Sequence, residues 1–343
     1  MKAAVLYEPE DLRIEERPVP EPDRDWVVIA VEAAGICGTD VAVYQGEHAA
    51  ELPRVLGHEF AGRILSVGEG VSGLAEGQRV MAEGSWCLEN GRVVAEGSIQ
   101  PCMSTQALGR TADGCFAEAV TVPVQAVHPL PPEVSAVEAQ SVTTVATAIH
   151  AVERAGDLTG TRIAIVGPGH AGLLLLQTCL VSGAQEATVL GTRDNRLDLA
   201  RDLGALATAN VRNAHFDQWL QSAAKRPFDA VFEASGTASG LALSFQLARL
   251  GGLVVCYGII DSSLDGVPGS LFYSKELTVI GSRGAGTCYR AAIDLLASAD
   301  VRVEPLISHI LPLQDAEKGF TIVTRRLEDV MRLVFTPHVT QEG

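Results

Sequence analysis

The sequence is short of positive charge, of paired cysteines and of long hydrophobic runs. It holds 26 lysine and arginine residues against 42 acidic residues, so its formal net charge is −16 at pH 7. Nucleic acids and anionic membranes bind basic surfaces, and we therefore expect neither as a partner. No apolar run is long enough to span a bilayer, and the N-terminus lacks the pattern of a signal peptide. Seven scattered cysteines indicate reduced thiols, which predicts a cytoplasmic protein.

The chain does have the length and the apolar content for two domains. Its 343 residues are 47% hydrophobic, so each of two domains can bury a core of its own. The first 150 residues are rich in valine, proline and short turns, which is typical of a β-rich domain. Beyond them the pattern changes to apolar strands that alternate with helices.

The run from Arg162 to Gly172, RIAIVGPGHAG, is the most informative motif. A β-branched strand leads directly into GxGxxG and then into an apolar helix. Gly167 allows a tight turn, Gly169 allows a pyrophosphate to approach the backbone, and Gly172 allows the helix to pack on the strand. The backbone N–H groups that start such a helix favour an anion. We therefore expect a dinucleotide rather than a plain buried glycine turn at Gly167, Pro168, Gly169, His170, Ala171 and Gly172.

The segments after this motif repeat the alternation. Apolar runs predict strands at 187–191, 228–235, 252–258 and 277–282, and helical patterns cover 196–203, 241–250 and 290–297. Near-continuous apolar strands between helices are typical of a doubly wound α/β fold, in which helices cover both faces of a parallel sheet. Ligands of such sheets bind beyond the carboxyl ends of the strands, so Ser235 and Gly258 are expected at the cofactor.

The end of the second strand bears on which dinucleotide is bound. NAD sites usually carry an acidic residue there, but this chain has Gly191, followed by Thr192 and Arg193, with Arg196 one helical turn further on. A guanidinium pairs with a 2′-phosphate, which a carboxylate would repel. We therefore favour NADP over NAD. The alternative is that both arginines are solvated surface charges, and the neighbouring Asp194 keeps that alternative open.

Two clusters in the β-rich domain could bind a metal. GICGTD at 35–40 and GHEFAG at 57–62 offer the thiolate of Cys37, the imidazole of His58 and the carboxylate of Glu59. Zinc accepts all three ligand types, and a catalytic zinc site needs only three protein ligands. Neighbours in an extended chain point to opposite sides, so Glu59 could instead support the site from outside.

The motifs together resemble those of one family. GICGTD, GHEFAG, DGCFAEAV at 113–120, GPGHAG, FEASG at 232–236 and GGLVVCYG at 251–258 follow the order and spacing of the medium-chain dehydrogenase/reductase family, in its zinc-type alcohol, polyol and threonine dehydrogenase branch. The resemblance covers essentially the whole chain. It implies a discontinuous GroES-like catalytic domain (1–150 and 290–343) and a Rossmann domain (151–289), with the active site in the cleft between them.

The resemblance also implies roles for single residues. Cys37 and His58 would be zinc ligands, with Glu59 a ligand or a close partner. Thr39 would start a proton relay from the substrate oxygen, and Thr147 would lie against the nicotinamide. The substrate would be a small molecule, and the chain would form a homo-oligomer, either a dimer or a tetramer.

Three positions depart from the family pattern. Thr143 stands where a third strong zinc ligand is usual, and a neutral hydroxyl is a poor ligand beside a thiolate. Only Cys87 and Cys102 fall near the positions of a structural zinc lobe, and two thiolates cannot close such a site, so we expect no structural zinc. Ala42 stands where relatives often have a histidine of the relay.

We therefore expect an NAD(P)-dependent oxidoreductase that moves a hydride between nicotinamide and a secondary alcohol or ketone. A polyol, an amino alcohol and a secondary-metabolite ketone all remain open as substrates. One alternative is a zinc-independent reductase of a polarised C=C or iminium bond whose metal site is vestigial. A more distant alternative is a non-catalytic nucleotide-binding protein.

Overall fold

The computed structural model describes residues 1–89, 92–94, 105–260 and 263–337, and the chain divides into two compact units. The terminal unit comprises residues 1–143, 292–298 and 303–343, and the central unit comprises 144–291 and 299–302. These bounds differ from the expected boundaries at 150 and 290. Two of the four divisions, after residues 143 and 291, fall inside the helices α3 (Val142–Ala155) and α9 (Tyr289–Ala297) rather than between elements.

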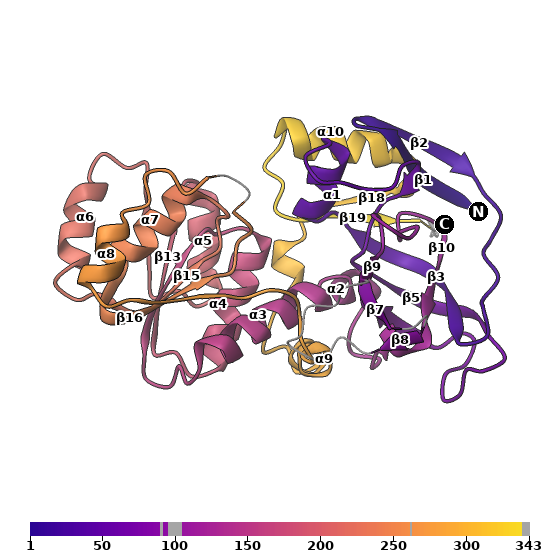
Figure 1. The fold of residues 1–343 in the computed structure, drawn as a ribbon, viewed down its shortest axis with the longest axis horizontal. Helices are drawn as coiled ribbons and strands as arrows, with labels where there is room; N and C mark the ends of the chain where they lie inside the picture. Colours follow the sequence, from indigo (N-terminus) through magenta and orange to yellow (C-terminus); the bar gives the residue numbers. More distant parts are fainter. Residues whose placement is uncertain (90–91, 95–104, 261–262, 338–343) are drawn as a thin grey trace. The chain divides into compact units, whose positions relative to one another are not determined.

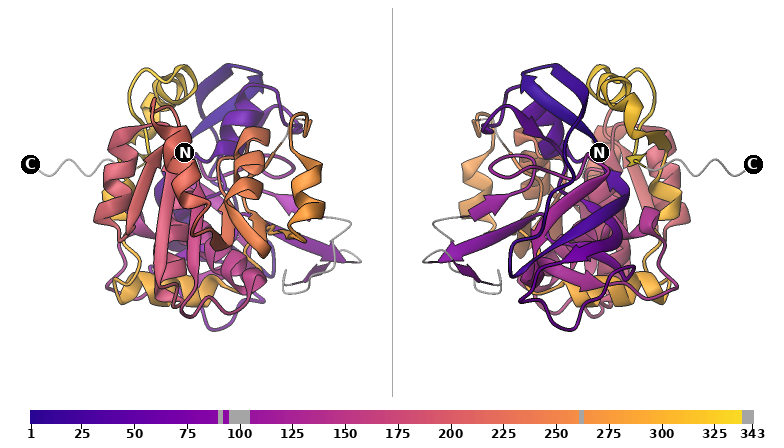
Figure 2. Two further views of the ribbon diagram at one scale, coloured as in Figure 1. Left: turned by 90° about the vertical axis from the view of Figure 1, so that its left-hand side faces the viewer. Right: turned by 90° about the vertical axis from the view of Figure 1, so that its right-hand side faces the viewer.

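The central unit is built on a six-stranded parallel sheet with the strand order β14-β13-β12-β15-β16-β17. In chain order this is 3-2-1-4-5-6, the doubly wound arrangement in which the order reverses between the first and fourth strands. Helices lie on both sides of the sheet (Figures 1 and 2). Its elements are β12 (Arg162–Val166), α4 (His170–Val181), β13 (Glu186–Gly191), α5 (Asp194–Asp202), β14 (Ala207–Asn210), α6 (Phe216–Ala223), β15 (Phe228–Glu233), α7 (Ala238–Leu247), β16 (Ala248–Cys256), α8 (Gly269–Ser274) and β17 (Thr278–Gly281), with most of α3.

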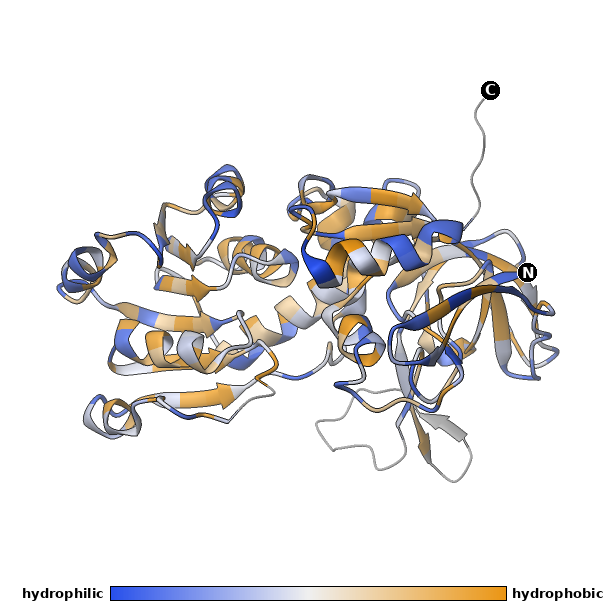
Figure 3. Cartoon of the chain, turned by 90° about the horizontal axis from the view of Figure 1, so that it is seen from above, coloured by the Kyte–Doolittle hydropathy of each residue, from blue (hydrophilic) through white to orange (hydrophobic). Residues whose placement is uncertain are grey.

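The inner strands of this sheet are buried on both faces, as the apolar runs predict. Four of the five residues of β12 and five of the six of β13 are buried. Figure 3 shows the strands mostly in orange and many blue residues on the outlying helices. The buried apolar side chains include Phe228, Val231 and Val254, so the strands form the core of the unit.

One predicted helix is too long. The apolar stretch 241–250 suggests a single helix, but α7 ends at Leu247 and β16 begins at Ala248. Ala248 pairs with Phe228 of β15, so the sheet recruits the last residues of the stretch. Tertiary pairing overrides a local apolar period at such a junction.

The terminal unit is mainly β. Its largest sheet has the order β11-β6-β5-β3-β19-β18, with β10 also paired to β3, and two three-stranded sheets have the orders β2-β1-β4 and β8-β7-β9. Its elements are β1 (Lys2–Glu8), β2 (Asp11–Glu16), β3 (Trp26–Gly35), α1 (Gly38–Tyr44), β4 (Arg54–Val55), β5 (Phe60–Val67), β6 (Arg79–Ala82), β7 (Ser85–Glu89), β8 (Arg92–Val94), β9 (Thr105–Ala107), β10 (Ala119–Pro123), β11 (Val127–Pro129), α2 (Ala136–Ala139), β18 (His309–Pro312), α10 (Ala316–Arg325) and β19 (Leu333–Thr336).

The C-terminal segment is an integral part of the terminal unit. β19 pairs antiparallel with β3, which lies some 300 residues earlier in the chain. Phe335 of β19 packs edge-on against Phe116 with ring centroids 5.2 Å apart, and Phe320 of α10 stacks on Tyr44 at 4.7 Å. These aromatic pairs join the two ends of the sequence in one core.

Two findings bear on the expectations drawn from composition. No helix among the described residues is long and apolar enough to cross a membrane. Five cysteines are free thiols, but Cys87 is disulfide-bonded, so the expectation of uniformly reduced thiols is wrong at that residue. The cytoplasmic placement that rested on it stays a prediction.

Candidate active site and cofactor cradle

Two paired strands bring the expected metal ligands together. β3 ends at Gly35 and β5 begins at Phe60, and the two strands are antiparallel neighbours. The Gly35 N–H donates to the Glu59 carbonyl at 2.9 Å, which holds the chain after β3 beside the chain before β5. Cys37 follows as the residue that caps α1. The local motifs thus converge because of sheet pairing and not because of sequence proximity.

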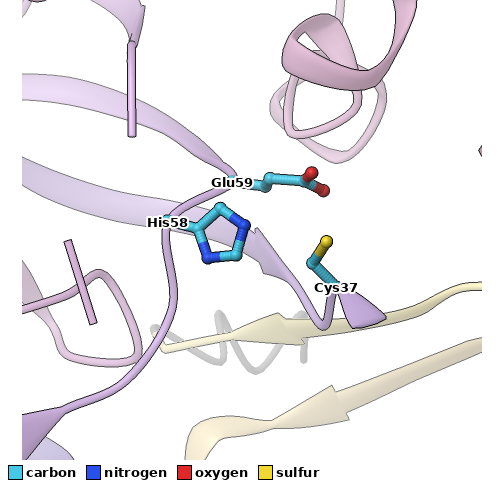
Figure 4. A group of neighbouring side chains, drawn as sticks. All are labelled: Cys37, His58 and Glu59. Atoms are coloured by element: carbon cyan, nitrogen blue, oxygen red, sulfur yellow. The ribbon is translucent and has the colours of Figure 1, made fainter. Parts of the chain in front are cut away.

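The three side chains form one cluster within the terminal unit. The ligand atoms of Cys37, His58 and Glu59 all lie within 4.8 Å of one another. Figure 4 shows the sulfur, one ring nitrogen and the carboxylate facing a common space. Residues 56–59 belong to no strand, and Gly57 has a φ of +94°, so the alternation of an extended chain does not separate His58 from Glu59. A thiolate, an imidazole and a carboxylate at this spacing fit a zinc ion.

Asp40 orients two members of this cluster. Its carboxylate lies 3.0 Å from Nδ1 of His58 and accepts the Cys37 backbone N–H at 2.8 Å. A carboxylate fixes the tautomer of a neutral histidine so that Nε2 is left to bind a metal. Burial lowers the pKa of His58, but the charge and hydrogen bond of Asp40 together with the neighbouring Cys37 raise it more, and the pKa lies well above its usual value. Sequence reasoning missed Asp40 although it lies inside GICGTD.

Arg332 holds the third member. Its guanidinium is 4% exposed and pairs with the Glu59 carboxylate. It also donates to the Gln140 side chain at 2.6 and 2.9 Å and to the Ile36 carbonyl at 2.7 Å. A carboxylate has two oxygens, so Glu59 can keep Arg332 and still offer a ligand atom. The available signal for Arg332 was one charge inside the apolar run 330–335.

The two threonines of interest have different settings. Thr39 is the second residue of α1 and half-buried, two positions after Cys37. The Thr143 hydroxyl, at the start of α3, is buried and has no hydrogen-bond partner among the described residues. Such an atom usually has a water or a ligand as its partner.

The glycine turn has the geometry that a dinucleotide requires. Gly167 has a φ of +115°, and a side chain there would collide with Ala234 and Ser235. A Cβ on Gly172 would meet the Gly167 carbonyl at 2.0 Å, so helix and strand pack closely. A Cβ on Gly169 would meet nothing within 4 Å, so only an external group would make use of its missing side chain. Gly169 is the N-cap residue of α4, which begins with His170 and Ala171. Because glycine has no side chain, no side chain of the N-cap residue accepts a hydrogen bond from the first N–H groups of the helix, and these groups favour an anion.

Steric hindrance explains why Gly191, the last residue of β13, stands where NAD sites usually carry an acidic residue. A Cβ on Gly191 would lie 2.4 Å from the ring of Pro168 in the glycine turn, so no acid fits at that position. Thr192 follows and is exposed, Arg193 caps α5, and Arg196 lies in its first turn. Asp194 is hydrogen-bonded to the Asn210 side chain at 2.7 Å.

Glu233 organises the next two strand ends. The side-chain carboxylate of this fully buried residue accepts the backbone N–H groups of Ser235 and Gly236. The backbone carbonyl of Glu233 accepts the N–H groups of Tyr257 and Gly258. Ser235 and Gly258 therefore lie together at the carboxyl ends of β15 and β16, as the sheet argument predicts. Sequence reasoning did not single out Glu233.

Thr147 is fixed within the central unit. Its hydroxyl donates to the Thr144 carbonyl at 2.8 Å and lies 2.9 Å from the Tyr257 hydroxyl. Tyr257 was likewise not predicted. Its position directly before Gly258 places it at the same strand end.

The expected structural zinc lobe offers one described cysteine. Cys87 lies in β7 and is disulfide-bonded, whereas Cys102 is outside the described residues. A sulfur in a disulfide is not a thiolate and cannot serve as a zinc ligand. The absence of a structural zinc stays a prediction that this observation supports.

Comparison with known proteins agrees with the two-unit architecture. Residues 23–132 match the model of the alcohol dehydrogenase GroES-like domain, and residues 171–298 match that of zinc-binding dehydrogenases. The predicted fold class, a Rossmann sheet with a GroES-like β domain, is confirmed.

Similarity to individual proteins extends over nearly the whole chain. Sorbitol dehydrogenase from Bombyx mori is 30% identical over 330 residues, which is 93% of this chain and 94% of that protein. L-threonine 3-dehydrogenase from Bacillus licheniformis is 31% identical over 317 residues, which is 90% and 91% of the two chains. A zinc-binding dehydrogenase structure from Sinorhizobium meliloti 1021, bound to NADP, superposes with a TM-score of 0.90 at 27% identity and covers 98% of this chain and 99% of that one.

Matched domain models, relatives at about 30% identity and a shared fold all agree with the motifs. The chain therefore belongs to the zinc-type medium-chain dehydrogenase/reductase family and is an alcohol or polyol dehydrogenase-like oxidoreductase.

Proposed function

We propose that this protein is a zinc-assisted, NADP-dependent dehydrogenase that interconverts a secondary alcohol and its ketone. The observation that carries the proposal is the convergence of the Cys37 sulfur, the His58 ring and the Glu59 carboxylate within 4.8 Å. A metal-free reductase has no chemical need for this ligand set. Asp40 and Arg332 hold its members in place, which is how a working metal site is supported.

The residues of the terminal unit would bind the metal and transfer the proton of the alcohol substrate. Zinc, when bound, supplies a Lewis acid for the substrate oxygen, and the nicotinamide supplies or accepts the hydride. Cys37 and His58 are the ligands, and Glu59 is a third ligand or a close partner. The Thr39 hydroxyl accepts the proton that leaves the substrate oxygen and passes it on.

The central unit would bind the cofactor. We place its pyrophosphate at residues 167–172, because the N-cap residue of α4, Gly169, has no side chain that could accept from the first N–H groups and leaves open space beside them. The remaining part of the cofactor would contact Thr147, Ser235 and Gly258. Gly191 and Thr192 leave room beside the ribose, where Arg193 and Arg196 favour a 2′-phosphate.

The preference for NADP can be measured through the two arginines. Replacing both Arg193 and Arg196 by alanine should raise the KM for NADP by roughly 100-fold or more, because each lost charge-assisted hydrogen bond is worth about 1.5–3 kcal/mol and about 1.4 kcal/mol corresponds to a factor of ten. The KM for NAD should change little, since NAD has no 2′-phosphate. Steady-state kinetics with both cofactors checks this, and an equal loss for the two would contradict the NADP assignment.

The substrate class that we propose is a small polyol or amino alcohol. The support is that a sorbitol dehydrogenase and an L-threonine 3-dehydrogenase are similar along nearly the full chain. A panel of sugar alcohols, vicinal diols and β-hydroxy amino acids, each assayed with both cofactors, tests this assignment.

The role of the metal is tested at its ligands. Cys37→Ala and His58→Ala should each abolish alcohol oxidation and lower the zinc content of the purified protein. Metal analysis and turnover are measured on the same samples, with Cys256→Ser, in β16 of the other unit, as the control. Full turnover in a zinc-free variant would select the alternative, a zinc-independent reductase. No turnover by the wild type on any alcohol or carbonyl would select the non-catalytic alternative.

We also propose that the chain forms a dimer or tetramer. β17 is an edge strand, and edge strands with apolar surroundings favour pairing between chains. Leu250, Phe272 and Tyr273, in the elements that precede β17, are 66%, 49% and 86% exposed. Light scattering at assay concentration tests this, and a monomer would contradict it.

A further inference from the structure

A second cluster of metal-binding side chains lies within the central unit. His150 and Glu153 are three positions apart in α3, so they lie on one face of the helix. Cys288 directly precedes α9, and its backbone N–H donates to the Ala285 carbonyl at 3.1 Å. None of the three belongs to the cofactor cradle or to the cluster around Cys37.

The three side chains are already close to one another. The Cys288 sulfur lies 3.3 Å from the Glu153 carboxylate, and Nδ1 of His150 lies 3.8 Å from the same carboxylate oxygen. All three ligand atoms are within 4.8 Å of one another. Zinc binds sulfur at about 2.3 Å and nitrogen or oxygen at about 2.0–2.2 Å, so neighbouring ligands of a tetrahedral site lie roughly 3.3–3.7 Å apart. Small rotations of the side chains would bring the present spacing to those values.

The backbone at this cluster is built for close approach. Gly286 has a φ of +53°, and a Cβ there would lie 3.1 Å from Nδ1 of His150. The loop therefore reaches the imidazole without an intervening side chain. Cys288 is 3% exposed, whereas the Glu153 side chain is 61% exposed, so the cluster has a buried sulfur and a side that is open to solvent.

We propose that His150, Glu153 and Cys288 bind a second zinc ion, with water completing the tetrahedron. The three donors are the ligand types that zinc accepts. This site would connect α3 to the loop before α9. The inference goes beyond the proposed function and uses none of its residues, so its failure would leave the dehydrogenase assignment intact.

Binding would exchange a proton for the metal. Burial and the neighbouring Glu153 raise the pKa of Cys288 to about 12, so the metal-free sulfur is a thiol that donates to the carboxylate. Zinc binds the thiolate, and the thiol proton therefore passes to the buffer. Proton release on metal addition is a direct readout of sulfur ligation that a merely structural hydrogen bond would not give.

The test uses the full chain with the first cluster disabled. Cys37→Ala protein is stripped with a chelator and titrated with cobalt, whose absorption reports thiolate ligation. We expect one thiolate-bound cobalt per chain, which zinc displaces. Adding Cys288→Ser should remove the thiolate absorption, and adding Cys256→Ser, a partly buried cysteine of the same unit, should leave it unchanged.

A second variant, Glu153→Gln, keeps the proposal testable if Cys288→Ser protein does not fold. Glu153→Gln alters an exposed side chain, and it should weaken metal binding by at least the roughly 10–100-fold that loss of a supporting partner costs at metal sites. No thiolate absorption in the Cys37→Ala protein would overturn the proposal. So would an affinity that Glu153→Gln leaves unchanged, because it would indicate adventitious metal only.

Discussion

At the scale of single residues, the candidate metal site depends on two charged groups that are not among its ligands. Asp40 is 3% exposed and has the His58 ring and the Cys37 backbone as partners. Arg332 is buried with Glu59, Gln140 and the Ile36 carbonyl. Asp40 therefore orients His58, and Arg332 orients Glu59. Both contacts also give buried polar atoms a hydrogen-bond partner.

Replacing Arg332 should show how much the terminal unit depends on it. In metal-free protein, Arg332→Met leaves the Glu59 carboxylate buried without its cation, which costs about 3–5 kcal/mol when a buried pair is broken. Urea unfolding of the metal-free wild type and variant measures the difference in the free energy of unfolding.

The double variant Glu59→Gln/Arg332→Met is the matched control. It removes both charges, so it should be considerably more stable than Arg332→Met alone, since no isolated charge stays buried. Equal stabilities of the single and double variants would show that the ion pair is not the source of the loss.

Local motifs indicated the candidate ligands, but not the residues that support them. Cys37, His58 and Glu59 lie in short segments whose residue types suit zinc, so a sequence pattern suffices to find them. The partner of Glu59 lies 273 positions away, and only the pairing of β19 with β3 brings it near. No local pattern carries that information.

At the scale of elements, the sequence was most informative for strands that contain several large apolar residues. β12, β13, β15, β16 and β17 all appear as apolar runs. β14 (Ala207–Asn210) was missed, because its sequence ATAN contains no large apolar residue and so produces no such run. Its place in the sheet comes from pairing with β13, which a local pattern does not show.

Asp229, near the start of β15, links this strand to its two neighbours. It accepts the Arg162 backbone N–H of β12 at 2.9 Å and pairs with Arg249 of β16 at 2.8 Å. The hydrogen bond from Arg162 lowers the pKa of Asp229, and the pair with Arg249 lowers it further. The charged carboxylate is therefore the form that holds the three strands together.

This link predicts a pH dependence. Because the folded pKa lies below the unfolded value of about 3.9, the carboxylate stabilises the fold above that value, and the contribution is lost as the pH falls through the folded pKa. The melting temperature of Asp229→Asn should lie below that of the wild type at pH 7, and the gap should close in acid. Melting curves across this range, with the exposed Asp198→Asn on α5 as control, check it. A gap that persists at the lowest pH would contradict the role of the charge.

At the scale of the whole molecule, the chemistry is divided between units with separate cores. The metal cluster lies entirely in the terminal unit, and the glycine turn lies entirely in the central unit. The change of texture along the sequence predicted this division. The exact bounds were not predictable, because α3 and α9 continue across them as regular helices.

The division predicts that the two binding functions can be lost one at a time. Gly169→Val places a side chain in space that is empty in the protein, so it should fold normally, keep its zinc and lose most of its affinity for the dinucleotide. Cys37→Ala should lose the metal of the Cys37 cluster and keep its affinity for the dinucleotide, because it removes a candidate zinc ligand and leaves the cradle intact. Calorimetry with NADP and metal analysis on both variants measure the two affinities, and turnover should be absent from each. Gly172→Ala serves as the structural control, since its Cβ would collide with the Gly167 carbonyl and should lower stability and cofactor affinity together. If Gly169→Val binds NADP as tightly as the wild type does, the cofactor does not lie on this turn.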